Sequence, residues 1–183
     1  SDWVHAGRYA AGLDPMTPAW GPTGQTLGEI AEAQDTEALL NKNPFERIVS
    51  INYPAIQPGQ THKVTIVLEA QGNENALGFS LKFNPSVITY QSALAGQDAA
   101  GAALLPNTGM INDGSVGFLL ALPTNQAFPA GKREALSVFF LVNANVTVDS
   151  TLIEFVDAPI PREIVDINAN LLTARWTAVS EAA

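Results

Sequence analysis

Hydrophobic and polar residues alternate with a period of two along most of the chain after residue 44. In the clearest case, Leu77, Phe79, Leu81 and Phe83 alternate with small or polar residues. Such alternation is typical of β-strands with one buried face. The pattern predicts about nine short strands, drawn from the segments 45–53, 62–70, 77–83, 87–94, 102–106, 115–122, 135–142, 152–156, 163–167 and 171–177.

Turn-forming residues separate these segments. Pro58-Gly59, the run 72–75 and Asn84-Pro85 each fall between two alternating stretches. Many short strands with regular turns predict a mostly β fold, an antiparallel β-sandwich of jelly-roll type over residues 44–183. Strands do not alternate with helices, so a nucleotide-binding α/β fold is not expected.

Residues 1–43 have a different pattern and predict an N-terminal arm, helical or extended. Residues 2–12 show helical periodicity, and the segment 14–22 holds three prolines that favour a stiff linker. Residues 26–41 carry an apolar stripe that predicts a second helix, with a partly ordered linker as the alternative.

Composition narrows the classes of function. The formal net charge is −9, which disfavours binding to nucleic acid, and there is no cysteine for a disulfide, a thiolate metal site or thiol catalysis. Only 15% of residues are charged, so much of the surface must be polar and uncharged, as in many secreted β-proteins. No apolar run approaches the roughly 20 residues of a membrane span, so no transmembrane segment is expected.

No pattern typical of an enzyme is present. The histidines are His5 and His62, and neither a Gly-x-Ser-x-Gly nor a His-Glu-x-x-His motif occurs. Paired carboxylates could serve glycoside hydrolysis or bind Ca²⁺, and three of the four candidates lie in a turn-rich stretch where carboxylates are normally solvated. These candidates are Glu154, Asp157, Glu163 and Asp166. We therefore expect a protein that is not an enzyme and that requires no cofactor.

Three segments in this order resemble a cohesin domain. They are the strand and Asn-Pro stop at 72–88, the turn and strand at 113–121, and the late core strand at 136–142. The resemblance covers residues 45–177 approximately. It implies a nine-stranded jelly-roll sandwich that binds another protein, since cohesins bind dockerin modules in cellulase assemblies and have relatives outside them. Residues 154–166 depart from the family pattern.

The resemblance also implies that one face of a sheet carries the contact with the partner. The outward positions Ser80 and Lys82 would lie near this contact, with neighbours from 102–105 and 115–119. The candidate partner-binding residues are therefore Ser80, Lys82, Ala103, Leu105, Ser115 and Gly117.

A smaller resemblance concerns the arm. Residues 2–12 are similar to the helix that ends a dockerin repeat, and Asp2 matches the last ligand of the Ca²⁺ loop in such repeats. The other ligands are absent, and one carboxylate cannot provide the six to eight oxygens that Ca²⁺ prefers. Asp2 is therefore a candidate for an incomplete Ca²⁺ site, and Ca²⁺ is the one ion to test.

Two alternatives stay open. The aromatic residues Trp3, Tyr9 and Trp20 of the arm could dock on a copy of the same chain, and strand 45–53 could pair with an open sheet edge, as in a surface layer or filament. The second alternative is a carbohydrate-binding module in which Trp176 contacts the sugar. In each case the expected setting is extracellular or at a cell surface, in a bacterium.

Overall fold

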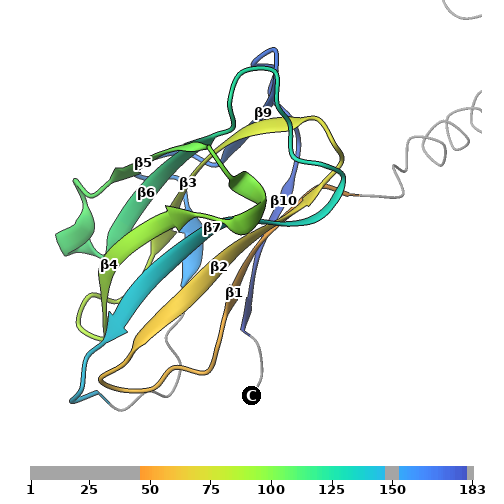
Figure 1. Cartoon of the computed structure of the whole chain (residues 1–183). Helices are drawn as coiled ribbons and strands as arrows, with labels where there is room; N and C mark the ends of the chain where they lie inside the picture. The colour runs from red at the N-terminus through yellow and green to blue at the C-terminus, as the bar shows by residue number, and fades with distance from the viewer. Residues whose placement is uncertain (1–45, 147–152, 181–183) are drawn as a thin grey trace, which may run out of the picture. The chain divides into compact units, whose positions relative to one another are not determined.

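The computed structural model describes residues 46–146 and 153–180. These residues form ten strands and two short 3₁₀ turns, η1 (Gln97–Ala99) and η2 (Ile111–Asp113). Figure 1 shows the strands, which are β1 (Ile48–Tyr53), β2 (Thr61–Ala70), β3 (Glu74–Lys82), β4 (Ile88–Ala95), β5 (Ala103–Asn107), β6 (Ser115–Ala121), β7 (Gly131–Val142), β8 (Glu154–Val156), β9 (Glu163–Asp166) and β10 (Arg175–Ser180). The predicted mostly β fold is confirmed.

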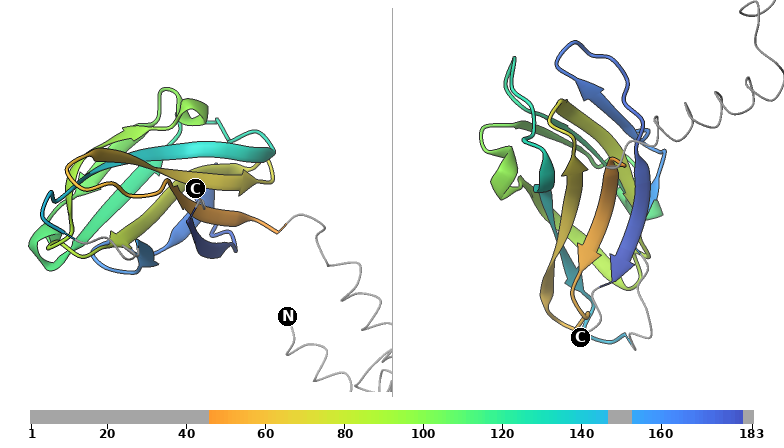
Figure 2. Two further views of the ribbon diagram at one scale, coloured as in Figure 1. Left: turned by 90° about the horizontal axis from the view of Figure 1, so that it is seen from below. Right: turned by 90° about the vertical axis from the view of Figure 1, so that its right-hand side faces the viewer.

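The strands lie in two layers (Figure 2). Sheet A has the strand order β10-β1-β2-β7-β4, and sheet B has the order β5-β6-β3-β8, with β9 also paired to β3. Neighbouring strands are antiparallel except β1 and β10, which run parallel. The predicted β-sandwich is confirmed. The suggestion that strand 45–53 pairs with an open edge is wrong, because β1 has β10 on one side and β2 on the other.

The core lies between the two sheets. It consists of the alternate strand residues that the sequence pattern marked as apolar. Phe79 and Phe118 of sheet B and Phe140 of sheet A are at most 1% exposed. The Phe79 and Phe118 ring centroids are 5.6 Å apart. Full burial of such a side chain contributes about 1.5–3 kcal/mol, so these inward positions fix which face of each strand points outward.

The last strand begins later than the sequence predicts. A strand was expected over 171–177, but Asp166 accepts hydrogen bonds from the backbone N–H groups of Asn168 and Asn170 in a tight turn. Leu171 then returns beside Val165 in an isolated bridge and is 71% exposed. The apolar residues near 171 thus belong to this turn, and the strand starts at Arg175.

The predicted arm lies outside the described residues, together with its helices at 2–12 and 26–41 and its linker at 14–22. The domain boundary near residue 44 likewise stays a prediction.

A buried ion pair joins three distant segments at one end of the sandwich. Arg47 is 6% exposed and Glu74 is fully buried, and the guanidinium donates to the Glu74 carboxylate. Arg47 also donates to the carbonyl oxygen of Thr173 at 2.7 Å, while Glu74 accepts from the backbone N–H of Gln71 at 2.8 Å. The pair therefore links the chain before β1 with the β2–β3 turn and the approach to β10.

Replacement of Glu74 by alanine should strongly destabilise the sandwich. The substitution leaves the Arg47 charge buried without its carboxylate, and breaking a buried pair in this way costs about 3–5 kcal/mol. Urea unfolding at neutral pH measures the loss. The matched control is Glu46→Ala, which removes the ion pair between Glu46 and Arg175, both more than half exposed, and should change the free energy of unfolding by less than about 1 kcal/mol. Equal effects of the two substitutions would contradict this role of the pair.

The same carboxylate should make stability depend on pH in the acid range. Burial raises the pKa of Glu74, but hydrogen bonds from Gln71 and Arg47 outweigh it and hold the pKa below the usual 4.5. The stabilisation is therefore fully present above pH 4.5 and is lost as the pH falls through the lower pKa of the folded state. Urea unfolding at a series of acid pH values should show a smaller decline for Glu74→Gln than for the unmodified chain.

Candidate interaction surface on sheet B

The outer face of sheet B carries small side chains at its centre. Along β3 the outward residues are Gly78 and Ser80, and along β6 they are Ser115 and Gly117. They alternate with inward residues such as Phe79. Because these outward side chains are so short, a further segment of chain can approach the sheet closely.

Residues 157–162 are that segment. The chain leaves the edge of β3 after β8 and rejoins it at β9, since β8 pairs with Ser80–Lys82 and β9 with Glu74–Gly78. Between the two strands the segment crosses the outer face. The Ser80 hydroxyl donates to the carbonyl oxygen of Ile160 at 2.7 Å and accepts from its N–H at 2.8 Å. The Ser115 hydroxyl donates to the carbonyl oxygen of Ala158 at 2.6 Å.

Gly117 is required by this close contact. A Cβ atom at Gly117 would lie 2.8 Å from Cγ1 of Ile160, and one at Gly78 would lie 3.4 Å from Cγ2 of the same residue. The first distance is too short for any carbon pair, so a side chain at 117 would push residues 157–162 away from the sheet. Small residues on β3 and β6 and the bulk of Ile160 are thus complementary.

An ion pair joins the first and last residues of this segment, Asp157 and Arg162. Arg162 donates from Nε and Nη2 to the two carboxylate oxygens of Asp157, both at 2.8 Å. The Arg162 guanidinium lowers the pKa of Asp157 from 3.8 to about 2. The carboxylate is therefore ionised, and able to hold the two ends of the segment together, at any pH above the low acid range.

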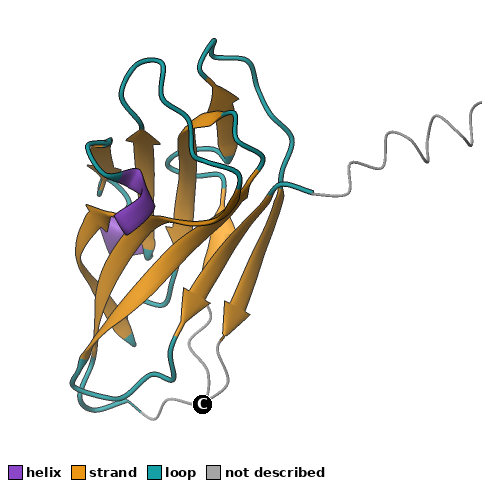
Figure 3. Cartoon of the chain, turned by 45° about the vertical axis from the view of Figure 1, so that its right-hand side comes forward, coloured by secondary structure: helices purple, strands orange, loops and turns teal. Residues whose placement is uncertain are grey.

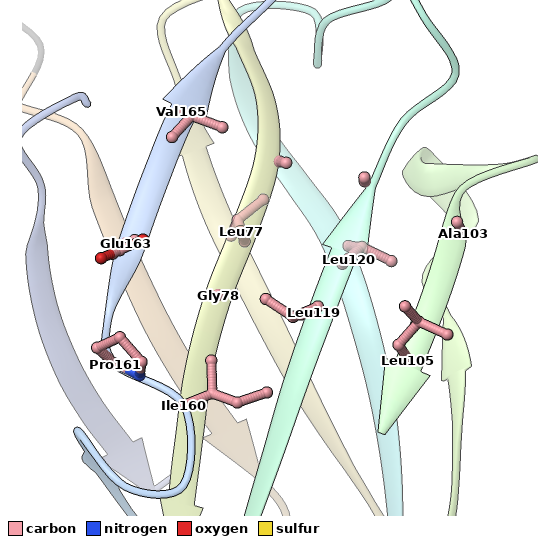
Figure 4. Close-up of a pocket in the computed structure, with 12 residues that line it drawn as sticks. Leu77, Gly78, Ala103, Leu105, Leu119, Leu120, Ile160, Pro161, Glu163 and Val165 are labelled. Carbon is pink, nitrogen blue, oxygen red and sulfur yellow. The ribbon is translucent and has the colours of Figure 1, made fainter. Parts of the chain in front are cut away.

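An apolar groove runs beside this segment (Figure 4). It has a volume of about 520 Å³. Leu105 of β5 and Leu119 of β6 are direct partners across the two strands and are 64% and 47% exposed. Ile160 and Pro161 lie along the opposite wall. The remaining lining residues are Ala76, Leu77, Gly78, Ala103, Leu120, Ala121, Glu163 and Val165.

The structure separates the predicted partner-binding residues into two groups. Ala103 and Leu105 line the groove, where their side chains are exposed. Lys82 is also exposed, and its ammonium group donates to the carbonyl oxygen of Asp113. The other three residues face outward but are buried beneath residues 157–162, and these are Ser80, Ser115 and Gly117. Direct contact with a partner through these three stays a prediction that would require the segment to move.

Sequence reasoning did not single out the wall of the groove. Ile160 and Pro161 lie in the stretch 154–166, whose departure from the cohesin pattern was the available signal. Leu119 lies in the range 115–119, which was named as neighbouring the partner contact. Its exposure could not be predicted, because residues 116–122 are almost all apolar and show no clear alternation.

Trp176, the residue considered for sugar binding, packs against the core together with two tyrosines. Trp176 is half-buried, and its ring centroid lies 5.0 Å from that of Phe155 and 6.1 Å from that of Phe79. Tyr53 and Tyr90 are half-buried against the same core. The arm residues Trp3, Tyr9 and Trp20 lie outside the described part of the chain.

Within residues 46–146 and 153–180, no three His, Cys, Asp or Glu side chains are grouped so that they could hold a metal ion. Asp2, the candidate Ca²⁺ ligand, is not among these residues. In the same part of the chain, no helix has the length and hydrophobicity needed to cross a membrane.

Comparison with known proteins gives structural matches alone. No protein-family model matches the chain, and no curated protein matches it. One similar solved structure is the sixth cohesin of scaffoldin B from Acetivibrio cellulolyticus, in complex with a Cel5 dockerin. It is 14% identical, with a TM-score of 0.61, over 75% of this chain and 99% of that one.

Two further structures share this fold. A non-cellulosomal cohesin from the archaeon Archaeoglobus fulgidus is 15% identical, with a TM-score of 0.60, over 74% of this chain and 89% of that one. The OlpA cohesin of Clostridium thermocellum, solved with a dockerin, is 16% identical, with a TM-score of 0.61, over 74% of this chain and 96% of that one. The sandwich of this chain therefore has a cohesin-like fold.

Proposed function

We propose that the sandwich is a non-catalytic module that binds another protein through the apolar groove on sheet B. The observation that carries the proposal is the exposed pair Leu105 and Leu119 beside the wall formed by Ile160 and Pro161. Apolar side chains clustered in a groove at the surface of a monomer are typical of protein interaction sites. Burial of these side chains by a partner would supply the main part of the affinity.

The structural neighbours support a protein as the partner. The cohesins of Acetivibrio cellulolyticus and Clostridium thermocellum were solved in complexes with dockerins. By analogy, we propose a dockerin-like module as the partner of this chain and an extracellular or cell-surface setting. The Glu163 carboxylate at the groove would favour a partner with a basic residue near its apolar contact face.

Residues 157–162 give this groove a shape of its own. Their hydrogen bonds to Ser80 and Ser115 fix the wall that Ile160 and Pro161 present. A partner would therefore contact the segment and the exposed leucines, while the small residues beneath serve to hold the segment in place. Such a preformed wall lowers the conformational entropy lost on binding.

Replacement of Leu119 by aspartate should weaken binding through the groove. We expect a loss of at least about 2 kcal/mol in binding free energy, near 30-fold in affinity, for a central apolar contact. Isothermal titration calorimetry against a panel of dockerin modules measures it. Leu94→Asp is the matched control, because Leu94 is 60% exposed on sheet A and should leave affinity unchanged. If no dockerin bound, or if both variants lost affinity equally, the proposal would fail.

Removal of the Ser80 hydroxyl should loosen the wall of the groove. Ser80→Ala removes both hydrogen bonds to Ile160, and a loss of about 1–1.5 kcal/mol would speed exchange of the Ile160 amide hydrogen about tenfold. Hydrogen exchange followed by NMR reads this residue directly. Ser92→Ala, at an exposed position of β4, is the control and should leave the Ile160 rate unchanged. An unchanged rate in Ser80→Ala would show that the segment is held by other contacts.

A further inference from the structure

Residues 157–162 interrupt what would otherwise be one continuous edge strand of sheet B. The last residue of β8, Val156, is paired with Ser80, and the first residue of β9, Glu163, is paired with Gly78. Since these partners are two positions apart on β3, a continuous strand would need one residue where this chain has six. The six residues form no strand and are drawn as loop in Figure 3. The segment therefore leaves β3 and returns to it at nearly the same place.

Few bonds hold this segment on the sheet. In the part of the chain that the structure describes, no hydrogen bond between two backbone groups involves residues 157–162. Their backbone is bonded instead to the hydroxyls of Ser80 and Ser115. The ion pair at its ends joins Asp157 and Arg162, which are 57% and 36% exposed, and exposed pairs add little stability. Because water satisfies the same hydroxyls when the segment leaves, each of these bonds also adds little net stability.

Open space borders the segment. The apolar groove lies between Ile160 and the exposed leucines of β5 and β6 (Figure 4). A second, more polar pocket of about 490 Å³ lies at the two ends of the segment and is lined by Asp157, Arg162, Ala174 and Trp176. Four of the six residues are exposed. The segment can therefore lift from sheet B without displacing another described element.

The surface beneath the segment is suited to contact with water. It consists of Gly78, Ser80, Ser115 and Gly117, and the two serines are at most 2% exposed while the segment covers them. Removal of the segment uncovers two hydroxyls and two glycines, and no large apolar side chain. The hydrophobic cost falls mainly on Ile160, which is already half-exposed. Opening therefore exposes much less apolar surface than unfolding of the sandwich.

We propose that residues 157–162 open and close over the outer face of sheet B while the sandwich stays folded. Val156 and Glu163 remain paired with β3 and are the hinges. The closed segment forms the wall of the apolar groove, and the open segment makes the serines and Gly117 accessible. A partner bound against Ile160 would hold the segment closed. This last consequence rests on the proposed function, whereas the opening itself does not.

Thiol labelling tests the opening, because the chain has no cysteine of its own. Ser115→Cys places a thiol beneath the segment, and the control Val116→Cys places one at the neighbouring position that is fully buried in the core. Ser92→Cys, at an exposed position of β4, gives the unhindered rate. An aromatic disulfide reagent should label Ser115→Cys at least about 100-fold faster than Val116→Cys, but more slowly than Ser92→Cys.

Urea below the unfolding transition separates the two routes to labelling. It should accelerate Val116→Cys and leave Ser115→Cys nearly unchanged, because the effect of urea scales with the surface that becomes exposed. Equal rates with equal urea dependence for these two variants would overturn the proposal. A rate for Ser115→Cys as high as that for Ser92→Cys would contradict the closed state.

Hydrogen exchange in the unmodified chain excludes an effect of the introduced thiol. The amide of Ile160, which donates to the Ser80 hydroxyl at 2.8 Å, should exchange at a rate that mild urea leaves unchanged. The amide of Val138, in β7 between β2 and β4, should exchange faster as urea is added. The same urea dependence for both amides would show that the segment moves only when the sandwich unfolds, against the proposal.

A substitution beneath the segment should shift the equilibrium toward the open state. A Cβ atom at Gly117 would lie 2.8 Å from Cγ1 of Ile160, so Gly117→Ala should raise the exchange rate of the Ile160 amide about tenfold and leave that of Val138 unchanged. An unchanged Ile160 rate in this variant would count against the opening. None of these measurements involves a partner, so their failure would leave the proposed binding through the groove unaffected.

Discussion

The packing of residues 157–162 against sheet B is the contact on which the outer surface of this sandwich depends. It requires small residues on two neighbouring strands, because Ile160 lies where any larger side chain at Gly117 would stand. It also requires two serine hydroxyls that satisfy backbone groups of the segment. One side of the sheet is thereby covered, and the apolar groove lies beside the covered part.

The buried pair of Arg47 and Glu74 has a comparable role at the end of the sandwich. It joins residues that are far apart in sequence, and its hydrogen bonds to the β2–β3 turn leave the carboxylate ionised although it is fully buried. A pair of this kind stabilises one arrangement of the three segments, because any other arrangement would leave a charge buried without a partner. The position of β10 beside β1 depends on this arrangement, since Arg47 also holds the carbonyl of Thr173 just before β10.

An exposed apolar surface results from these constraints. The groove on sheet B offers exposed apolar side chains and suits a partner whose own apolar face is complementary.

Much of the fold could be predicted from the sequence. A strand in a sandwich buries every second side chain, so apolar and polar residues alternate within each strand by itself. The alternation of Leu77, Phe79 and Leu81 correctly placed Ser80 on the outer side of its strand. The strand at 171–177 was placed too early, because apolar residues of the turn after β9 continue the same pattern.

The functional surface was predicted only in part. Ala103 and Leu105 were expected at an exposed face and are found there, whereas Ser80, Ser115 and Gly117 were expected on the same face and lie beneath another segment. A strand's own pattern tells which side a residue faces, but not whether a distant segment covers that side. Most of the strands, the direction of their side chains and the absence of cysteine chemistry could thus be read from the amino-acid sequence. Only the tertiary structure decided which outward residues are exposed, because that depends on contacts between residues 80 positions apart, such as Ser80 and Ile160.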